Sequence, residues 1–533
     1  MNAAAQFVDA NVEAGRADNV AIRYVADGSA HTYGDVWRSV NRVGNALRAL
    51  DIDLEQRVML LLLDGPDFAA SFFGAIKAGV VPIPVNTLLK PDDYEYLLND
   101  SRARALIVSQ PLLAGIEPIR GGLRHLQHLI VADPPPTPER APHAEPPAPT
   151  AGQSVHALRD LVGAASSELD PEPMDSDDAC FWLYSSGTTG FPKGTVHLQH
   201  DMGVCAETFG RHVLEIGHGD VTFSVAKLFF AYGLGNALYY PFHVGATTVL
   251  DPRRPTPAAV FEVLKRYAPT IFYSVPTNYG ALLADSDLPD RDALAGLRMC
   301  VSAGEALPQA LYHRWLEHFG HEILDGIGST EILHMFISNQ PGAARPGSSG
   351  QIVPGYEARL VDGEGAPVAT GDVGDLLIKG DSICAHYWNR HEQTKATMLG
   401  EWICTGDRYR VDDDGYYWYQ GRADDMLKVG GIWVSPFEVE AAVIEHPDVL
   451  EAAVVGAKDE GQLVKPKAFV VLRPEVAAAL GEADRGHKAR EIQDFVKERI
   501  AAYKYPRWVE FLDELPKTAT GKIQRYRLRD AAE

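Results

Sequence analysis

Apolar and polar positions follow two different periods over the first 130 residues. Residues 32–50 and residues 67–78 carry apolar side chains at helical spacing, and the second stretch ends at Gly79. Residues 58–63, which stop at Asp64-Gly65-Pro66, and residues 80–85 are short apolar runs typical of buried strands. Strands that alternate with helices predict parallel strand–helix–strand units, so we expect an α/β scaffold here.

The same alternation continues between residues 175 and 380. The candidate central strands end near Gly, Pro or small residues and comprise residues 246–250, 271–275 and 299–302. Ligands of parallel α/β sheets bind beyond the carboxyl ends of the strands. The predicted walls of a binding site are therefore the turns at residues 275–276, 303–306 and 326–331.

Two segments depart from this pattern. Residues 133–150 are rich in Pro, Ala and charge and cannot bury an apolar face, so they predict a mobile surface excursion. A recognition sequence for a partner is the alternative for that segment. Residues 421–425 begin a charged, Gly-rich stretch, and an α/β segment of domain size follows it to residue 533. A hinge and a plain charged loop fit residues 421–425 equally well.

Charge narrows the class of ligand. The 533 residues include 49 Lys and Arg against 72 Asp and Glu, a net charge of −23, and the apolar fraction of 46% is that of a soluble globular protein. Such an acidic chain disfavours nucleic acid and an anionic membrane as partners. An anionic ligand would need local positive charge, so each lysine or arginine beside a glycine-rich loop gains weight.

Cysteine and histidine spacing gives no metal or disulfide framework. The five cysteines and 18 histidines include no Cys-x-x-Cys and no His-Glu-x-x-His, and scattered cysteines are typical of a reducing compartment. The first residues lack a basic region followed by a long apolar run, and no apolar run reaches membrane-spanning length. We therefore expect a cytoplasmic protein.

One glycine-rich segment after the apolar run at residues 180–184 carries the clearest chemistry. It reads Tyr184-Ser185-Ser186-Gly187-Thr188-Thr189-Gly190-Phe191-Pro192-Lys193-Gly194. Its glycines let the backbone approach a ligand, its N–H groups and hydroxyls offer donors, and Lys193 adds positive charge, a combination that suits phosphate. The Gly-x4-Gly-Lys-Ser/Thr spacing of a P-loop is absent. Taken alone, the segment fits a flexible surface turn equally well.

This segment resembles the phosphate loop of the adenylate-forming enzymes, which include acyl- and aryl-CoA synthetases, luciferases and peptide-synthetase adenylation domains. Further motifs of that family follow in the expected order over nearly the whole chain. The resemblance implies a large N-terminal domain of α/β sandwich layers at residues 1–421, a hinge at 422–425 with Asp424 as the pivot, and a small mobile C-terminal α/β domain at 426–533. It also implies ATP, Mg²⁺ and coenzyme A.

The segment from Gly326 to Glu331 is similar to the family's Tyr-Gly-x-Thr-Glu motif, whose Thr and Glu serve phosphate and magnesium. From the residues alone, Glu331 suits Mg²⁺, which takes oxygen ligands, and the same pattern also fits a helix N-cap. Ile327 replaces the family's aromatic residue beside the adenine, which puts stacking there in doubt. Asp325 matches the position that contacts the adenine amine, and residues 304–306 match the segment on its other side.

Three further motifs complete the nucleotide site that the resemblance implies. Asp407 matches the aspartate that binds the ribose hydroxyls, although alone its motif would be an ordinary turn, and Arg422 matches the arginine on the ribose and phosphate side. Lys522 lies in a match to Pro-Lys-Thr-x-x-Gly-Lys and would offset charge between the carboxylate and the α-phosphate, whereas a lone lysine in a tail is more often solvated. The implied ATP and AMP site comprises Ser185, Ser186, Gly187, Thr188, Thr189, Gly190, Lys193, Gly304, Glu305, Ala306, Asp325, Gly326, Ile327, Gly328, Ser329, Thr330, Asp407, Arg422 and Lys522.

The implied catalytic set is Lys522, Thr330, Glu331 and Lys428, with Glu331 as the metal ligand. In the family the small domain rotates after adenylate formation. By resemblance, this rotation would bring Lys428 to the site together with a CoA path formed by Gly430, Gly431 and Trp433.

Residues 227–236 occupy the family's aromatic gate, and their aromatic and small side chains suit a flat ring, although ordinary core packing fits them too. The implied acyl site comprises Phe230, Ala231, Tyr232, Gly304, Gly328, Leu333 and His334. His334 could hydrogen-bond a ring substituent or cap a helix turn. The order Ile-Leu-His after Thr-Glu resembles the benzoate-CoA ligase branch, which includes 4-hydroxybenzoate enzymes.

The predicted function is therefore an ATP-dependent, AMP-forming ligase that activates a benzoate-type acid to an acyl-adenylate and transfers it to CoA. A ligase for 4-hydroxybenzoate or another substituted or cyclic acid, and a free-standing adenylation domain that loads a carrier protein, are the alternatives. A non-catalytic nucleotide-binding regulator is the third, and Lys522 argues against it. The expected partners are small molecules, and the sequence leaves both a monomer and a homodimer open.

Overall fold

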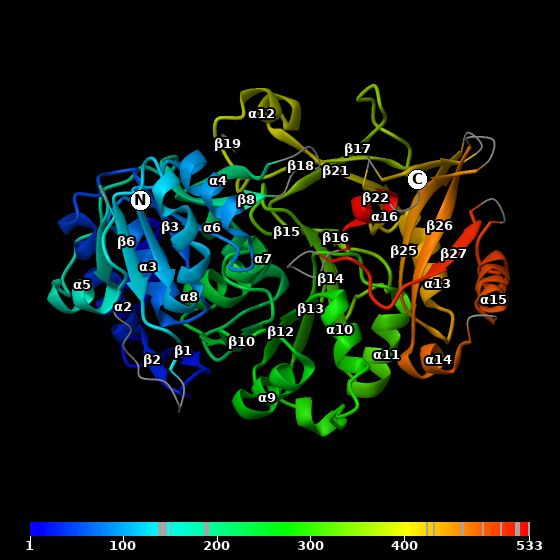
Figure 1. The fold of residues 1–533 in the computed structure, drawn as a ribbon, viewed down its shortest axis with the longest axis horizontal. Coiled ribbons are helices and arrows are strands. Elements are labelled where there is room, and N and C mark those ends of the chain that lie inside the picture. Colours follow the sequence, from blue (N-terminus) through cyan, green and yellow to red (C-terminus); the bar gives the residue numbers. More distant parts are fainter. Residues whose placement is uncertain are drawn as a thin grey trace.

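The computed structural model has a large N-terminal α/β body and a smaller C-terminal one, drawn on the right of Figure 1. It describes residues 1–136, 146–150, 152–185, 191–422, 425–429, 432–459, 463–481, 484–501, 504–517 and 523–530. The centre of the predicted excursion at 133–150 and the predicted pivot Asp424 lie outside these residues. The α/β fold class with a large and a small body is confirmed.

The largest sheet has nine strands, of which six neighbours in its centre run parallel. In spatial order its strands are β16 (Gln351–Ile352), β15 (Met335–Ser338), β14 (Ile323–Gly328), β13 (Met299–Ser302), β12 (Ile271–Ser274), β10 (Val221–Ser224), β11 (Thr247–Leu250), β1 (Val20–Tyr24) and β2 (Ala30–Thr32). Strands β2, β15 and β16 pair antiparallel at the two edges. The three central strands expected from the apolar runs are confirmed as β11, β12 and β13.

A second sheet is entirely parallel and lies in the part of Figure 1 coloured blue to cyan. Its order is β4 (Val81–Pro84), β3 (Arg57–Leu61), β5 (Ala105–Ser109), β6 (His128–Ala132) and β7 (Ser154–Ala157). The runs at 58–63 and 80–85 form β3 and β4, and their side chains are almost all buried, as both faces of a parallel sheet require. One apolar core joins this sheet to the first.

Two smaller antiparallel sheets complete the large body. The first has three strands, β19 (His386–Tyr387), β9 (Lys193–Leu198) and β8 (Ala179–Ser185). The second contains β17 (Glu357–Val361), β18 (Gly374–Lys379), β21 (Trp402–Val411), β20 (Met398–Leu399) and β22 (Tyr417–Arg422). The buried strand expected before the glycine-rich segment is β8, and it forms a hairpin with β9.

The helices of the large body begin at residues that the sequence marks. Thr32 caps α2 (Tyr33–Ala49): its side chain accepts from the Asp35 N–H while the Asp35 carboxylate accepts from the Thr32 N–H. The remaining helices drawn over this body are α1 (Ala10–Glu13), α3 (Pro66–Lys77), α4 (Pro91–Ser101), α5 (Leu158–Ala164), α6 (Asp201–Cys205), α7 (Ala231–Leu234), α8 (Tyr240–Val244), α9 (Pro257–Tyr267), α10 (Pro276–Leu283), α11 (Gln309–Phe319) and α12 (His391–Thr397). The predicted helices at 32–50 and 67–78 are confirmed as α2 and α3.

The C-terminal body has an apolar core of its own. Its strands are β23 (Leu427–Val429), β24 (Ile432–Val434), β25 (Val449–Lys458), β26 (Val464–Leu472) and β27 (Trp508–Phe511). Its helices are α13 (Pro436–Ile444), α14 (Pro474–Ala479), α15 (Arg485–Lys497) and α16 (Arg525–Asp530). Figure 1 shows α16 between β22 of the large body and β25, and the rings of Tyr419 and Phe437 meet across this boundary at 5.6 Å.

No helix among the described residues combines the length and the apolar character needed to cross a bilayer. The exact domain boundaries at residues 421 and 426 stay predictions.

A buried ion pair fixes α16 to the C-terminal body. Arg525 donates to both carboxylate oxygens of Glu440, at 3.0 and 2.8 Å, and the Glu440 carboxylate also accepts the Val454 N–H at 2.7 Å. Glu440 is 5% exposed, and its charge raises the pKa of Arg525. Removing the arginine would leave a buried carboxylate without its counter-charge, which costs about 3 kcal/mol.

We therefore expect Arg525→Leu to lower the free energy of opening of β25 by about 3 kcal/mol. Hydrogen exchange of the Val454 amide measures this change directly, because that N–H is bonded to Glu440. Lys497→Leu is the matched control, since it removes the exposed pair with Asp494. Equal exchange rates in both variants would contradict the role given to Arg525.

Candidate functional site

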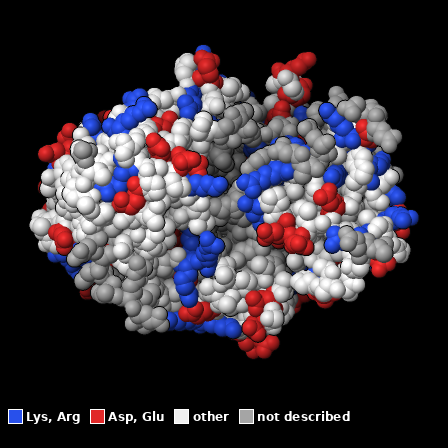
Figure 2. Space-filling view, in the orientation of Figure 1, with Lys and Arg blue, Asp and Glu red and all other residues white. Residues whose placement is uncertain are grey.

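The carboxyl ends of three neighbouring parallel strands form one wall of the site. Ser274 of β12 pairs with Ser302 of β13, and Ser302 pairs with Asp325 of β14, so these three residues lie at one level of the sheet, and β14 continues from there to Gly328. Figure 2 shows Lys and Arg side chains around the hollow between the two halves of the molecule. The acidic chain therefore gathers positive charge where an anion would enter.

Asp325 lies on this edge with one carboxylate oxygen unused. Its side chain is 4% exposed, the Leu307 N–H donates to its Oδ2 at 3.3 Å, and its Oδ1 has no hydrogen-bond partner among the described residues. Burial raises the pKa of Asp325 to about 8. The carboxyl group therefore holds its proton at neutral pH and has an oxygen ready for a donor such as an amine.

Gly304 and Gly328 are glycine for different physical reasons. Gly304 follows β13 with φ +92°, a backbone conformation that favours glycine. Gly328 lies at the end of β14 beside β15, where a Cβ atom would come within 2.6 Å of the His334 carbonyl oxygen. The sequence placed residues 326–328 in a turn, and this was wrong: they belong to β14, and Ile327 pairs with Ile337.

Glu331 follows in the turn after β14 and receives two hydrogen bonds. Ser185 Oγ and Tyr387 Oη donate to its Oε1 at 3.1 and 2.9 Å. Among the described residues both of these bonds end on Oε1, which leaves Oε2 for a hard cation. The Lys193 ammonium lies 4.1 Å from the centre of the Tyr387 ring, so a cation and a carboxylate flank one tyrosine. The free carboxylate oxygen of Glu331 is a ligand that fits Mg²⁺.

The ends of the glycine-rich segment are held firmly. Ser185 and Lys193 pair across the β8–β9 hairpin, and residues 186–190, which include the expected Ser186, Gly187, Thr188, Thr189 and Gly190, lie outside the described residues. Phe191 stacks on Tyr96 with ring centres 4.6 Å apart, and Tyr96 Oη donates to the Pro192 carbonyl at 3.0 Å. Sequence reasoning missed Tyr96 and Tyr387, since neither lies in a recognisable motif.

The two residues expected at the ribose pair with each other. Asp407 of β21 lies opposite Arg422 of β22, and the Arg422 guanidinium donates to the Asp407 carboxylate at 3.2 Å. Gly406, which directly precedes Asp407, has φ +75°, a conformation that favours glycine. The arginine orients the Asp407 carboxylate.

Two of the predicted acyl residues, Tyr232 and His334, lie against each other beside this edge. Phe230 precedes α7, which carries Ala231 and Tyr232, and the Tyr232 ring lies 5.5 Å from the His334 ring. His334 Nε2 lies 3.3 Å from the Tyr232 carbonyl, which can only accept, so Nε2 carries the proton. The His334 side chain is bonded to a main-chain carbonyl of α7.

The electrostatic state of His334 follows from its burial. His334 is 2% exposed, and burial lowers its pKa to about 3, so the imidazole is neutral. Its Nδ1 has no hydrogen-bond partner among the described residues and presents an acceptor lone pair. Leu333 beside it is fully buried with φ +71°, an uncommon conformation for a residue with a side chain.

One end of the segment that contains Lys522 contacts the large body. Lys517 and Ile523 pair as an antiparallel bridge, and the Ile523 N–H donates to the Glu305 carboxylate at 3.3 Å. Lys522 itself lies outside the described residues, as do Gly430 and Gly431. Lys428 and Trp433 pair across the β23–β24 hairpin, and their side chains are not described. Their roles stay predictions.

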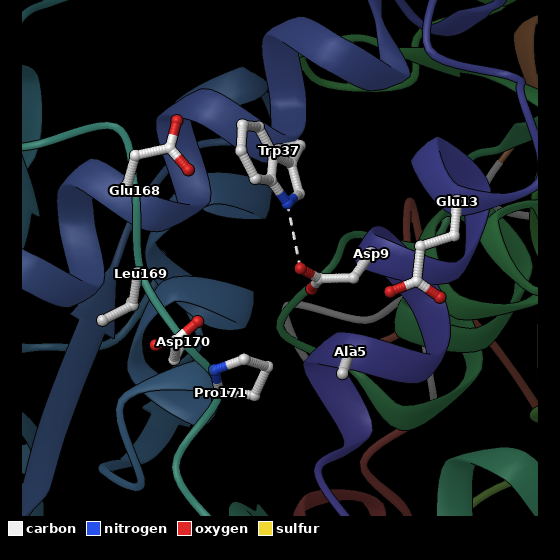
Figure 3. Close-up of a pocket in the computed structure, with 8 residues that line it drawn as sticks. All are labelled: Ala5, Asp9, Glu13, Trp37, Glu168, Leu169, Asp170 and Pro171. Carbon is white, nitrogen blue, oxygen red and sulfur yellow. Dashed lines mark hydrogen bonds between the residues drawn. The ribbon is translucent and has the colours of Figure 1, made fainter.

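A cavity of about 340 Å³ lies elsewhere, between the N-terminal helix and α2 (Figure 3). It is lined by Ala5, Asp9, Glu13, Trp37, Glu168, Leu169, Asp170 and Pro171. Trp37 Nε1 donates to Asp9 Oδ1 at 2.9 Å, and the fully buried Lys77 pairs with the same carboxylate. Four carboxylates would repel a nucleotide or an aryl acid, which excludes this cavity as the active site.

Comparison with known proteins agrees with this geometry. A family described as AMP-binding enzyme matches residues 8–388, and one described as AMP-binding enzyme C-terminal domain matches residues 438–522. A benzoate–CoA ligase of Thauera aromatica is 52% identical over 532 residues, which cover 99% of this chain and 96% of that protein.

Two solved structures show the same fold over the full length. A benzoate CoA ligase from Burkholderia xenovorans LB400 superposes with a TM-score of 0.89 and 45% identity, covering 99% of this chain and 100% of that chain. An anthranilate CoA ligase in complex with anthranoyl-AMP gives a TM-score of 0.91 and 46% identity, covering 100% and 97%. The chain belongs to the AMP-binding enzymes.

Proposed function

We propose that the chain is an AMP-forming aryl-CoA ligase that uses ATP to activate benzoate or a close relative. One observation carries this proposal: Glu331, with one carboxylate oxygen left for a cation, lies in the same turn as the neutral His334, whose ring contacts Phe209, Tyr232 and Tyr240. The 52% identity to a benzoate–CoA ligase over the full chain supports the choice of acid.

The first half-reaction joins the acid to AMP. The aryl carboxylate attacks the α-phosphate, a P–O bond forms, and pyrophosphate leaves with the electrons of the broken P–O bond. Lys193 and Lys522 would offset the negative charge that accumulates in this step. Mg²⁺, held by Glu331 and by the phosphates of ATP, would neutralise part of the triphosphate charge.

The docking of the C-terminal body suits this first step. The Ile523 N–H is bonded to Glu305, so the residue after Lys522 lies beside a residue that we assign to the adenine wall. For the second step a thiol must reach the adenylate, and rotation about Asp424 would replace this motif by the hairpin with Lys428, Gly430, Gly431 and Trp433. The thiolate of CoA then attacks the acyl carbon, and AMP leaves.

A hydroxy- or aminobenzoate is a second candidate substrate. The free Nδ1 lone pair of His334 can accept a hydrogen bond from a ring hydroxyl or amino group, which benzoate itself lacks. A neutral imidazole also keeps the pocket free of charge, which suits an uncharged ring.

The substrate prediction is tested with a panel of acids, ATP and CoA. We expect benzoate and its hydroxy, amino and fluoro derivatives to support AMP and aryl-CoA formation, and hexanoate and cinnamate to be poor substrates. His334→Leu should reduce kcat/KM for hydroxy- or aminobenzoate by about tenfold relative to benzoate, the value of one lost hydrogen bond. A medium-chain fatty acid that outperforms every aryl acid would contradict the aryl assignment.

The raised pKa of Asp325 predicts that ligand binding releases a proton. An adenine amine that donates to Asp325 favours the ionised carboxylate, so binding should release the proton that burial retains below about pH 8. Calorimetry at pH 7 in two buffers of different ionisation enthalpy, with a benzoyl-sulfamoyl adenosine that does not itself titrate there, should show release approaching one proton. Asp325→Asn keeps an acceptor and should abolish the release.

The same group predicts a pH dependence of stability. Because the folded-state pKa of Asp325 is raised from 3.8 to about 8, the folded protein binds more protons across that range, and stability is lost as pH rises through it. Asp325→Asn should therefore raise the Tm more at pH 9 than at pH 5. If Asp325→Asn raised the Tm equally at pH 5 and pH 9 and left the proton release on ligand binding unchanged, this would contradict a buried neutral carboxyl at Asp325.

A further inference from the structure

The turn that carries Glu331 is held through its main chain by several elements. The carbonyl of Glu331 accepts the Cys384 N–H at 2.8 Å, and the carbonyl of Ile332 accepts the Ser382 hydroxyl at 2.8 Å. The carbonyl of Thr330 accepts from His197 Nε2 at 2.8 Å. Three consecutive carbonyls therefore have partners from outside the turn, which is more than a surface loop needs.

The turn needs such support because its backbone is strained. Leu333 closes it with φ +71°, which costs about 1 kcal/mol for a residue with a side chain. Conformations of this kind persist only where the surroundings over-determine them. The Ile332 carbonyl also accepts from Cys205 Sγ at 3.8 Å. Among these described partners, His197 is the one that acts on the peptide unit joining Thr330 to Glu331.

His197 is itself fixed in direction. It lies on β9, is fully buried, and stacks on Phe181 with ring centres 5.1 Å apart. Its Nδ1 lies 2.7 Å from Asp201 Oδ2, and Asp201, also fully buried, accepts the Leu198 N–H on the same oxygen at 3.1 Å. The Thr330 carbonyl can only accept, so His197 Nε2 must donate to it.

The position of this bond links it to the metal ligand. Ser185 and Tyr387 hold the Glu331 carboxylate only through Oε1, so the direction of Oε2 also depends on where the main chain places the Glu331 Cα and Cβ. The peptide unit held by His197 sets that placement. A tilt of this unit would turn Oε2 away from the phosphate side without breaking the site apart.

We propose that His197, oriented by Asp201, is a positioning residue that aims the Glu331 carboxylate at the cation of the nucleotide. The inference rests on the proposed function, because it assigns Glu331 to Mg²⁺. The hydrogen bonds of the His197 ring run to Asp201 and to the Thr330 carbonyl, so its effect on the cation would pass through the turn that carries Glu331. Its loss should weaken the response to the metal and leave the affinity for benzoate unchanged.

Replacing His197 by Gln or by Asn tests the two ring nitrogens separately. In His197→Gln the side-chain nitrogen lies where Nε2 does and can still donate to Thr330, whereas in His197→Asn it lies where Nδ1 does and reaches only Asp201. We expect the Asn variant to need about tenfold more Mg²⁺ for half-maximal benzoate-dependent pyrophosphate release, with the KM for benzoate unchanged. The Gln variant should stay within about twofold of the parent protein.

A second readout does not depend on activity. The rise in Tm produced by MgATP, compared with that produced by ATP and EDTA, should be retained by the Gln variant and lost by the Asn variant. His243→Asn is the control: it removes another histidine–carboxylate contact, the partly exposed one from His243 of α8 to Glu207 at 3.2 Å. Should the Asn variant fail to fold, His197→Leu fills the ring's volume without a donor and carries the same expectation.

Equal Mg²⁺ requirements in the Gln and Asn variants, or an Asn variant that changes the KM for benzoate as much as the Mg²⁺ requirement, would overturn the proposal. A parent protein that shows no benzoate-dependent pyrophosphate release would instead overturn the proposed function. The Tm comparison with MgATP still decides the role of His197 in that case.

Discussion

Two anions must be brought together by a chain that is itself strongly acidic. Repulsion between a carboxylate and a triphosphate a few ångströms apart is the constraint that the site has to meet. The structure meets it locally: basic side chains surround the hollow, Lys193 lies beside Tyr387, and the Glu331 carboxylate has one oxygen free for a cation. The neutral His334 keeps further charge out of the acyl side. The nucleotide side of the site is therefore charged, and the acyl side is uncharged.

Much of the scaffold could be predicted from the sequence because it depends on local patterns. The period of apolar residues located α2, α3, β3, β4 and the central strands, and the capping pair Thr32 and Asp35 marks the start of α2. The prediction failed at residues 326–328, where glycine suggested a turn. These glycines serve the close approach of β15, an event of tertiary packing that no local pattern contains.

In the candidate site, too, features set by local sequence could be predicted and features set by tertiary packing could not. Motif residues such as Asp325, Glu331, Asp407 and Arg422 could be proposed from the sequence, because the segments that contain them resemble motifs of the adenylate-forming enzymes. The residues that aim them could not be found, since Tyr387 lies 56 positions from Glu331 and His197 lies 133 positions from Thr330. Only the folded chain brings such pairs into hydrogen-bond distance, and burial then sets the pKa values of Asp325 and His334.

Under the proposed function, the C-terminal body, bonded to Glu305 through Ile523, delivers Lys522 for the first half-reaction alone. Comparing Lys522→Ala with the parent protein in two assays tests it most directly: benzoate-dependent exchange of pyrophosphate into ATP, and conversion of preformed benzoyl-adenylate and CoA to benzoyl-CoA. The account predicts that exchange falls by at least about a hundredfold while the second conversion stays within a few-fold of the parent. Undiminished exchange, or an equal fall in both assays, would contradict it.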